Sequence, residues 1–150
     1  MAQTLTSLLV HVVFSTKDRQ DMIDAPIEPR LYSYLGGIAR KMESRLLDAG
    51  GTANYVHLLI SQSKNIALAT LLEELKKSSS IWIKQQGREY SKFKWQEGYG
   101  GFSVGTLQVP ALKAYFAKQK EHHHKITFQE EFIDFLNRYE IEYKEQYLWR

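Results

Sequence analysis

The residues of this 150-residue chain best suited to chemistry are a histidine, a tyrosine and a glutamine. His57 lies in "NYVHLLIS", where a strand would place Tyr55 and His57 on one face. In "VPALKAYFAKQKEHHHK", Tyr115, Gln119 and His122 share one face of a predicted helix. A phenol and an amide one turn apart could point together at a phosphate and a bound cation, and an imidazole is a common metal ligand. The alternative is an amphipathic helix with a partly buried tyrosine and an ordinary surface glutamine.

The elements that would position these residues follow from hydrophobic periodicity and from the placement of glycine and proline. Strands are predicted within residues 5–15, 46–49 and 55–61 and at the ends of the glycine-rich "WQEGYGGFSVG". Helices are predicted from Pro29, over about 66–86, from Pro110, and over 128–139. This order, β-α-β-β-α-β followed by helices, indicates one α+β domain over residues 1–150. We expect the ferredoxin-like split βαβ pattern, an antiparallel sheet with helices on one face plus C-terminal helices.

That topology predicts which side chains share the second face of the sheet. The first strand would lie beside the third, so His11, Val13 and Ser15 would face the same way as Tyr55 and His57. Helices cover one face, and the other must be covered as well or left for a ligand. The function is therefore expected on this second face.

Composition narrows the class of protein. Hydrophobic residues make up 43% of the chain, which predicts a packed core. The absence of cysteine excludes thiolate zinc sites, thiol nucleophiles and disulfides, and agrees with a cytoplasmic location. No apolar stretch is long enough to cross a bilayer, and the N-terminus lacks the features of a signal peptide, so no membrane association is expected.

The distribution of charge suggests a polyanionic partner. Residues 76–94 carry six lysines and arginines against a single acid, although a solvated helix face would look the same. Basic residues beside hydroxyls suit backbone phosphates, and the candidates are Lys17, Arg19, Lys76, Lys77 and Ser80. Trp82 and Trp95 could stack on unpaired bases or could serve packing.

Six segments, in order, give the chain a family resemblance: "HVVFSTKDRQ", "VHLLIS", "LKKSSSIWI", "WQEGYGGFSVG", "AYFAKQKEHHHKITFQEEF" and "YLW". The sequence resembles the HUH-class tyrosine transposases, and more narrowly the insertion-sequence (IS-two-hundred-like) and REP-associated single-strand transposases. The resemblance implies a dimeric ferredoxin-like domain that cuts and rejoins single-stranded DNA near hairpins. The implied partners are single-stranded or hairpin DNA and a second copy of the chain.

The resemblance also implies roles for single residues. Tyr115 matches the nucleophile, whose attack leaves a 5′-phosphotyrosine and a free 3′-hydroxyl. His57 and Gln119 match two ligands of a divalent metal, Mg²⁺ or Mn²⁺, and His122 matches a position that could contact DNA. A cation suits this chemistry, since a phenol with a pKa of about 10 is almost wholly neutral at pH 7 and attacks poorly without activation.

At the metal site the sequence departs from the family pattern. The first histidine of the strand motif is Tyr55 here, and the preceding aspartate is Asn54. A neutral phenol is a weak ligand for a hard cation, and even changes around the ligands typically cost about 10- to 100-fold in metal affinity or activity. Three groups could compensate: Tyr55 as a phenolate, the amide oxygen of Asn54, or His11 from the neighbouring strand. We therefore expect impaired metal-dependent cleavage.

Three functions follow from these observations. The first is a single-strand transposase that uses Tyr115, His57 and Gln119. The second is a hairpin-DNA-binding protein on the same fold, catalytically weak or inactive because of Tyr55. The third, an RNA-binding module of RRM-like architecture, is disfavoured because the chain lacks the aromatic strand motif of that class.

Overall fold

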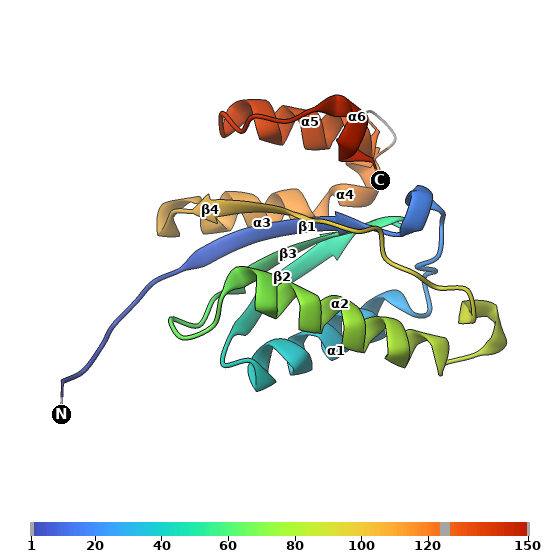
Figure 1. Cartoon of the computed structure of the whole chain (residues 1–150), viewed down its shortest axis with the longest axis horizontal. Helices are drawn as coiled ribbons and strands as arrows, with labels where there is room; N and C mark the ends of the chain where they lie inside the picture. Colours follow the sequence, from blue (N-terminus) through green and yellow to red (C-terminus); the bar gives the residue numbers. More distant parts are fainter. Residues whose placement is uncertain (1, 124–126, 150) are drawn as a thin grey trace.

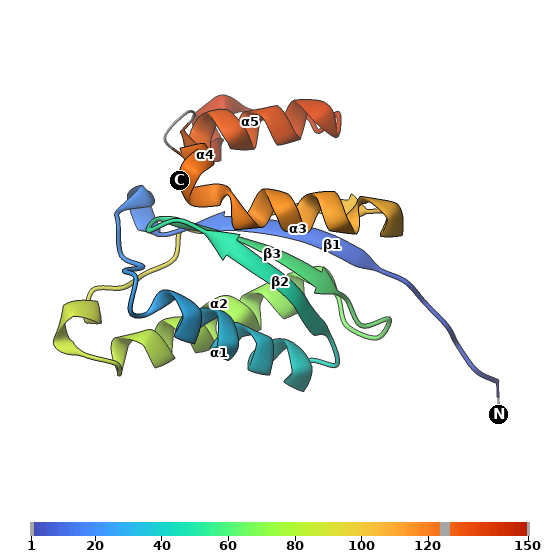
Figure 2. The same ribbon diagram turned by 180° about the vertical axis from the view of Figure 1, so that it is seen from behind.

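A four-stranded antiparallel sheet runs through the middle of the molecule, with helices on both faces (Figures 1 and 2). The structure is a computed structural model that describes residues 2–123 and 127–149. Its strands are β1 (Leu9–Ser15), β2 (Arg45–Gly51), β3 (Tyr55–Ser61) and β4 (Gly100–Val104), in the order β2-β3-β1-β4. The first and third strands are neighbours, as the sequence predicts.

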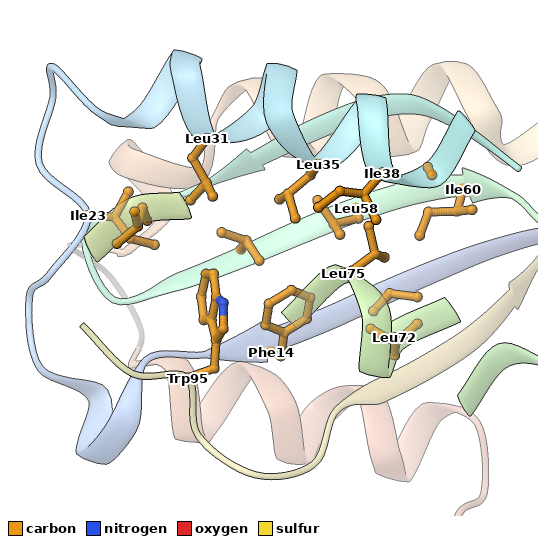
Figure 3. Close-up of a cluster of buried hydrophobic side chains, with 14 of the residues drawn as sticks. Phe14, Ile23, Leu31, Leu35, Ile38, Leu58, Ile60, Leu72, Leu75 and Trp95 are labelled. Atoms are coloured by element: carbon orange, nitrogen blue, oxygen red, sulfur yellow. The ribbon is translucent and has the colours of Figure 1, made fainter. Parts of the chain in front are cut away.

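Two long helices cover the first face of the sheet. These are α1 (Glu28–Lys41), which has Pro29 in its first turn, and α2 (Leu68–Lys84). Their apolar stripes pack on the alternate residues of β1 and β3 that point toward them, including Phe14 and Leu58 (Figure 3). This packing buries the larger of the two hydrophobic cores.

The C-terminal part of the chain covers the second face, above the sheet in Figure 1. It contains α3 (Val109–Ala117), α4 (Gln119–His123), α5 (Phe128–Arg138) and the short α6 (Glu145–Leu148). Other elements are connected by the 3-10 helices η1 (Lys17–Arg19), η2 (Arg88–Tyr90) and η3 (Thr106–Gln108). A second cluster of buried apolar residues lies on this face and consists of Val13, Tyr55, Phe102, Phe128, Phe135 and Leu136.

Two glycines allow α3 and α5 to approach the sheet closely. A Cβ atom on Gly50 of β2 would lie 2.6 Å from the carbonyl oxygen of Phe116 in α3. A Cβ atom on Gly100 of β4 would lie 2.7 Å from the ring of Phe132 in α5. Because Gly50 is paired with His57, the missing side chain brings α3 next to that imidazole.

The predicted fold class is confirmed, with differences in detail. The second face is covered by the chain's own helices and is not left open for a ligand. The prediction of one continuous helix through Tyr115 and Gln119 is wrong, because α3 ends at Ala117 and Lys118 caps it at φ −100° and ψ 11°. The turn brings Gln119 into the interior, with 1% of its surface exposed. None of the described helices has the length and apolar character needed to span a membrane.

Candidate active site

Polar side chains from five elements meet between the second face of the sheet and the C-terminal helices. They are His11 of β1, Tyr55 and His57 of β3, Tyr115 of α3, Gln119 of α4 and Glu131 of α5. Most are deeply buried: the exposed fraction is 0% for His57 and 4% for Glu131. Buried polar groups of this kind are stable only when they satisfy one another.

The two histidines lie diagonally across the β1–β3 pair, since Val13 is opposite His57 and His11 is opposite Leu59. Nε2 of His11 is 2.7 Å from Nδ1 of His57, so one ring nitrogen donates a hydrogen bond to the other. Burial, together with the nearby His57, lowers the pKa of His11 to about 3. His11 is therefore neutral at pH 7. Its Nε2 lies next to Nδ1 of His57, which leaves Nε2 of His57 facing away from His11.

On the other side of the His57 ring stands a carboxylate that the sequence analysis did not single out. Nε2 of His57 is 2.7 Å from Oε1 of Glu131. Despite this short distance, the buried Nε2 makes no hydrogen bond of acceptable geometry with any described residue. A signal for Glu131 was present in the sequence, because it stands three residues after Phe128 and four before Phe135, within the apolar side of its helix.

Tyr115 and Gln119 meet in the same network although they belong to different helices. The Tyr55 hydroxyl donates to Oε1 of Gln119 at 3.0 Å, and the Tyr115 hydroxyl is hydrogen-bonded to the side chains of Gln119 and Glu131. The ring of Tyr115 is edge-on to that of His57, with 5.7 Å between their centroids. Burial first, and then the Glu131 carboxylate, raise the pKa of Tyr115 above its usual value, so the phenol is neutral at pH 7.

The donor atoms here suit a hard or borderline divalent cation. Within the described residues, no group of three or more His, Cys, Asp or Glu side chains is arranged to hold a metal ion. A mixed set of possible ligands belongs to one network: the imidazole of His57 contacts the carboxylate of Glu131, and the Tyr115 hydroxyl joins Glu131 to the amide of Gln119. Nitrogen and oxygen ligands of these types bind Mn²⁺ and Mg²⁺, so the residues present fit such a cation.

A cavity of about 530 Å³ between α3 and α5 leads to this site. His11, Tyr115 and Glu131 contribute to its wall, and its other lining residues include Leu107 and Arg138. Tyr115 is half-buried and faces this space. A substrate group could therefore reach the phenol without unfolding of the covering helices.

Three of the predicted DNA-contacting residues lie far from this site, on the opposite side of the sheet. Lys76, Lys77 and Ser80 belong to α2, which packs on the first face (Figure 1). The ammonium of Lys76 donates to the backbone carbonyls of Gln96 and Gly98, each at 2.6 Å. Burial lowers the pKa of Lys76 to about 8. Lys77 is exposed and Ser80 is half-buried.

Lys17 and Arg19 are in η1, immediately after β1. The guanidinium of Arg19 lies 5.5 Å from the ring centre of Trp149. Nη1 of Arg19 and Nε2 of Gln96 are buried without hydrogen-bond partners in the described chain, and both residues line a cavity of about 180 Å³. The side chain of His122 lies outside the part that the structure describes.

The two tryptophans considered for base stacking have packing roles in the fold. Trp95 is 6% exposed, lies edge-on to Phe14, and donates from Nε1 to the Ser79 hydroxyl at 3.0 Å. Trp82 is half-buried and stacks on Tyr34 with 4.7 Å between ring centroids. Trp95 is therefore part of the core.

Comparisons with known proteins agree with this architecture. The family model described as "Transposase IS200 like" matches residues 4–119. A solved structure of a candidate transposase from Deinococcus radiodurans R1 is similar, with 18% identity and a TM-score of 0.62 over 79% of this chain and 95% of that one. A REP-associated tyrosine transposase bound to a REP hairpin is similar at 10% identity and a TM-score of 0.62, over 84% of this chain and 76% of that one. No curated protein sequence matches.

Proposed function

We propose a function from the premise that this chain belongs to the IS200-like transposase family, whose model matches residues 4–119. Our proposal is that it cuts and rejoins single-stranded DNA, with Tyr115 as the nucleophile. The single observation that carries the proposal is the meeting of the Tyr115 hydroxyl with Gln119 and with the Glu131–His57 pair, beside a cavity that substrate can enter.

The chemistry proposed for Tyr115 is a transesterification. Its oxygen forms a bond to the scissile phosphorus as the bond to the 3′ oxygen breaks, which leaves a 5′-phosphotyrosine and a 3′-hydroxyl. The phenol loses its proton and the 3′ oxygen gains one, so rejoining is the reverse step and needs no external energy. His57 and Gln119 would hold Mg²⁺ or Mn²⁺, which when bound would polarise the phosphate and stabilise charge on the leaving oxygen.

Tyr55 makes this site weaker than the family pattern. Its hydroxyl donates to Oε1 of Gln119, so one of the two lone pairs of that oxygen is already used and competes with a bound cation. A phenol in place of an imidazole also removes a good ligand. The same observation favours a second candidate function, a hairpin-DNA-binding protein that no longer cleaves.

A labelling experiment separates these two functions. We would incubate the protein with a pool of hairpin oligonucleotides that have randomised single-stranded flanks, with and without MnCl₂. A transposase should transfer a 3′-end label, but not a 5′-end label, to protein, and Tyr115→Phe should abolish the transfer. Tyr143→Phe is the matched control, because Tyr143 lies in the exposed segment after α5. Retention of DNA without an adduct, unchanged by Tyr115→Phe, would support the binding protein.

DNA contacts by Lys17, Arg19, Lys76, Lys77, Ser80 and His122 remain part of the proposal. Arg19 is the best supported, because its buried Nη1 and the Nε2 of Gln96 are two donors that a phosphate oxygen could satisfy. Retention of the hairpin pool by Arg19→Ala, compared with wild type at several salt concentrations, tests this contact. Unchanged retention would remove Arg19 from the interface.

A homodimer is also proposed, and it raises the question of which chain supplies the nucleophile. The contacts of Tyr115 with Gln119 and Glu131 lie within one chain. We therefore propose that Tyr115 serves the site of its own subunit. A mixture of Tyr115→Phe and His57→Ala subunits should then give no adduct, whereas restored adduct would indicate exchange between subunits.

A further inference from the structure

We propose that Glu131 is a ligand of the divalent cation and takes the place left by the missing histidine. This inference rests on the proposed function, because it concerns the cation attributed there to His57 and Gln119. It adds a residue from α5, whereas the other two proposed ligands belong to β3 and α4.

The position of Glu131 carries the proposal. Its Oε1 is 2.7 Å from Nε2 of His57, a little less than the separation of about 3 Å between neighbouring ligands of an octahedral cation with bonds of about 2.1 Å, so a small outward movement would let one ion bind both atoms. Its carboxylate also contacts the hydroxyl of Tyr115, and that hydroxyl contacts Gln119. A cation bound by the imidazole and the carboxylate would therefore lie next to the nucleophile, whose hydroxyl also contacts the amide of Gln119.

Burial and charge point the same way. Glu131 is 4% exposed, and its helix surrounds it with Phe128 and Phe135. A carboxylate in such a place is costly unless cationic or hydrogen-bonding groups compensate it. A divalent cation bound by Glu131 would add to the compensation that the contacts with His57 and Tyr115 already give. Carboxylate oxygen is also a better ligand for Mg²⁺ or Mn²⁺ than the phenol of Tyr55.

The three groups considered from sequence are less well placed. Nε2 of His11 is at Nδ1 of His57, on the other side of the ring from Glu131. The amide of Asn54 is engaged elsewhere, since its oxygen accepts from the Thr52 hydroxyl at 2.9 Å and its nitrogen donates to the carbonyl of Arg19 at 3.2 Å. The Tyr55 hydroxyl donates a hydrogen bond to Oε1 of Gln119.

Direct measurement of Mn²⁺ binding tests the inference without reference to cleavage. Free Mn²⁺ gives a six-line paramagnetic resonance signal that is lost on binding, so titration of the full chain with MnCl₂ yields a Kd. We expect Glu131→Gln to raise this Kd at least 10-fold, by analogy with changes around metal ligands. Asp134→Asn is the matched control, because Asp134 is exposed on the same helix and lines the same cavity. Its Kd should equal that of wild type.

Two further measurements make each outcome decisive. Circular dichroism in EDTA checks that Glu131→Gln is folded, and Glu131→Asp, which keeps the carboxylate, should bind Mn²⁺ more tightly than Glu131→Gln.

If His57→Gln loses Mn²⁺ while Glu131→Gln retains it, the inference is overturned and the proposed metal site survives. The inference is likewise overturned if Glu131→Gln abolishes adduct formation at unchanged Mn²⁺ affinity. If wild type binds no Mn²⁺, the metal site and the inference both fail.

Discussion

At the scale of single residues, Tyr55 is the most consequential position, because the family resemblance implies a histidine there. The Tyr55 hydroxyl donates a hydrogen bond of 3.0 Å to Oε1 of Gln119, one of the two proposed ligands. The imidazole of His57 is in turn held between His11 and Glu131. These side chains therefore already contact one another, and the proposed cation would compete with some of those contacts.

Tyr55→His should strengthen the metal site. The change supplies an imidazole nitrogen and frees Oε1 of Gln119, and we expect the Kd for Mn²⁺ to fall by about 10- to 100-fold, with a matching rise in adduct yield. Loss of the hydrogen bond to Gln119 and of the ring packing against Phe128 should lower metal-free stability by about 2–4 kcal/mol. Mn²⁺ titration and thermal unfolding in EDTA measure the two effects. An unchanged Kd would contradict our account of Tyr55.

The alternation of side chains along strands was enough to predict that His11, Tyr55 and His57 share one face of the sheet. Their hydrogen-bond partners could not be predicted, because they depend on how α3, α4 and α5 dock. Glu131 illustrates this: its place among phenylalanines was visible, but its contact with His57 requires the path of the chain after Gln119. Docking geometry, rather than local pattern, decided the chemistry of the site.

At the scale of elements, close helix–sheet packing sets the position of Tyr115. Gly50→Ala would place a Cβ atom 2.6 Å from the carbonyl oxygen of Phe116, so α3 must move away from β2. We expect a loss of about 1–3 kcal/mol in the free energy of unfolding. Because Tyr115 precedes Phe116, adduct formation should fall as well.

Gly37→Ala is the control for this substitution. Nothing lies within 4 Å of a Cβ atom at Gly37, which is inside α1. Alanine there should stabilise the protein by about 0.5–1 kcal/mol through its helix propensity. Urea unfolding of both variants measures the difference. Equal effects at the two glycines would show that close approach is not what Gly50 provides.

The start of α1 depends on a contact with η2. Asp24 accepts from the backbone N–H of Ile27 at 3.0 Å, and it also accepts from the Tyr90 hydroxyl at 2.8 and 2.9 Å. Tyr90→Phe should therefore cost about 1.5–3 kcal/mol at pH 8, the usual range for a hydrogen bond to a charged group.

Tyr90 should also make the free energy of unfolding depend on pH in the alkaline range. Burial, with the Asp24 carboxylate, raises the pKa of Tyr90 from 10.0 to about 12. A raised pKa means that the unfolded state loses its proton first, so the stabilisation is complete below pH 10 and disappears as pH rises through 12. The gap in unfolding free energy between wild type and Tyr90→Phe should shrink over that interval. A constant gap in urea titrations at successive pH values would contradict this coupling.

At the scale of the whole molecule, the sequence predicted the β-α-β-β-α-β order and the pairing of β1 with β3. It did not predict the break after Ala117, because the residues around Lys118 are all compatible with a continuing helix. The break arises from tertiary contacts, since it lets Gln119 reach Tyr55. It also allows α5 to fold back over the second face. The position of the chain after Ala117, which covers the site, was thus the hardest feature to predict from the sequence.

The two faces of the molecule raise a question about the path of DNA. Tyr115 is on the second face, whereas Lys76 and Lys77 extend from α2 on the first face (Figures 1 and 2). A bound hairpin would have to pass an edge of the sheet to touch both. The two lysines differ in their contacts, because the ammonium of Lys76 is held by the carbonyls of Gln96 and Gly98 while Lys77 is exposed.

Salt dependence of hairpin binding should distinguish these two lysines. If Lys77 contacts a phosphate, Lys77→Ala should reduce the slope of log K against log salt by about 0.7 and leave thermal stability unchanged. Lys76→Ala should instead lower the free energy of unfolding by about 1–3 kcal/mol, because two backbone carbonyls lose their donor. Lys41→Ala, an exposed lysine at the end of α1, is the control. An equal change of slope for Lys41 and Lys77 would indicate diffuse attraction by the whole basic surface rather than a DNA path over α2.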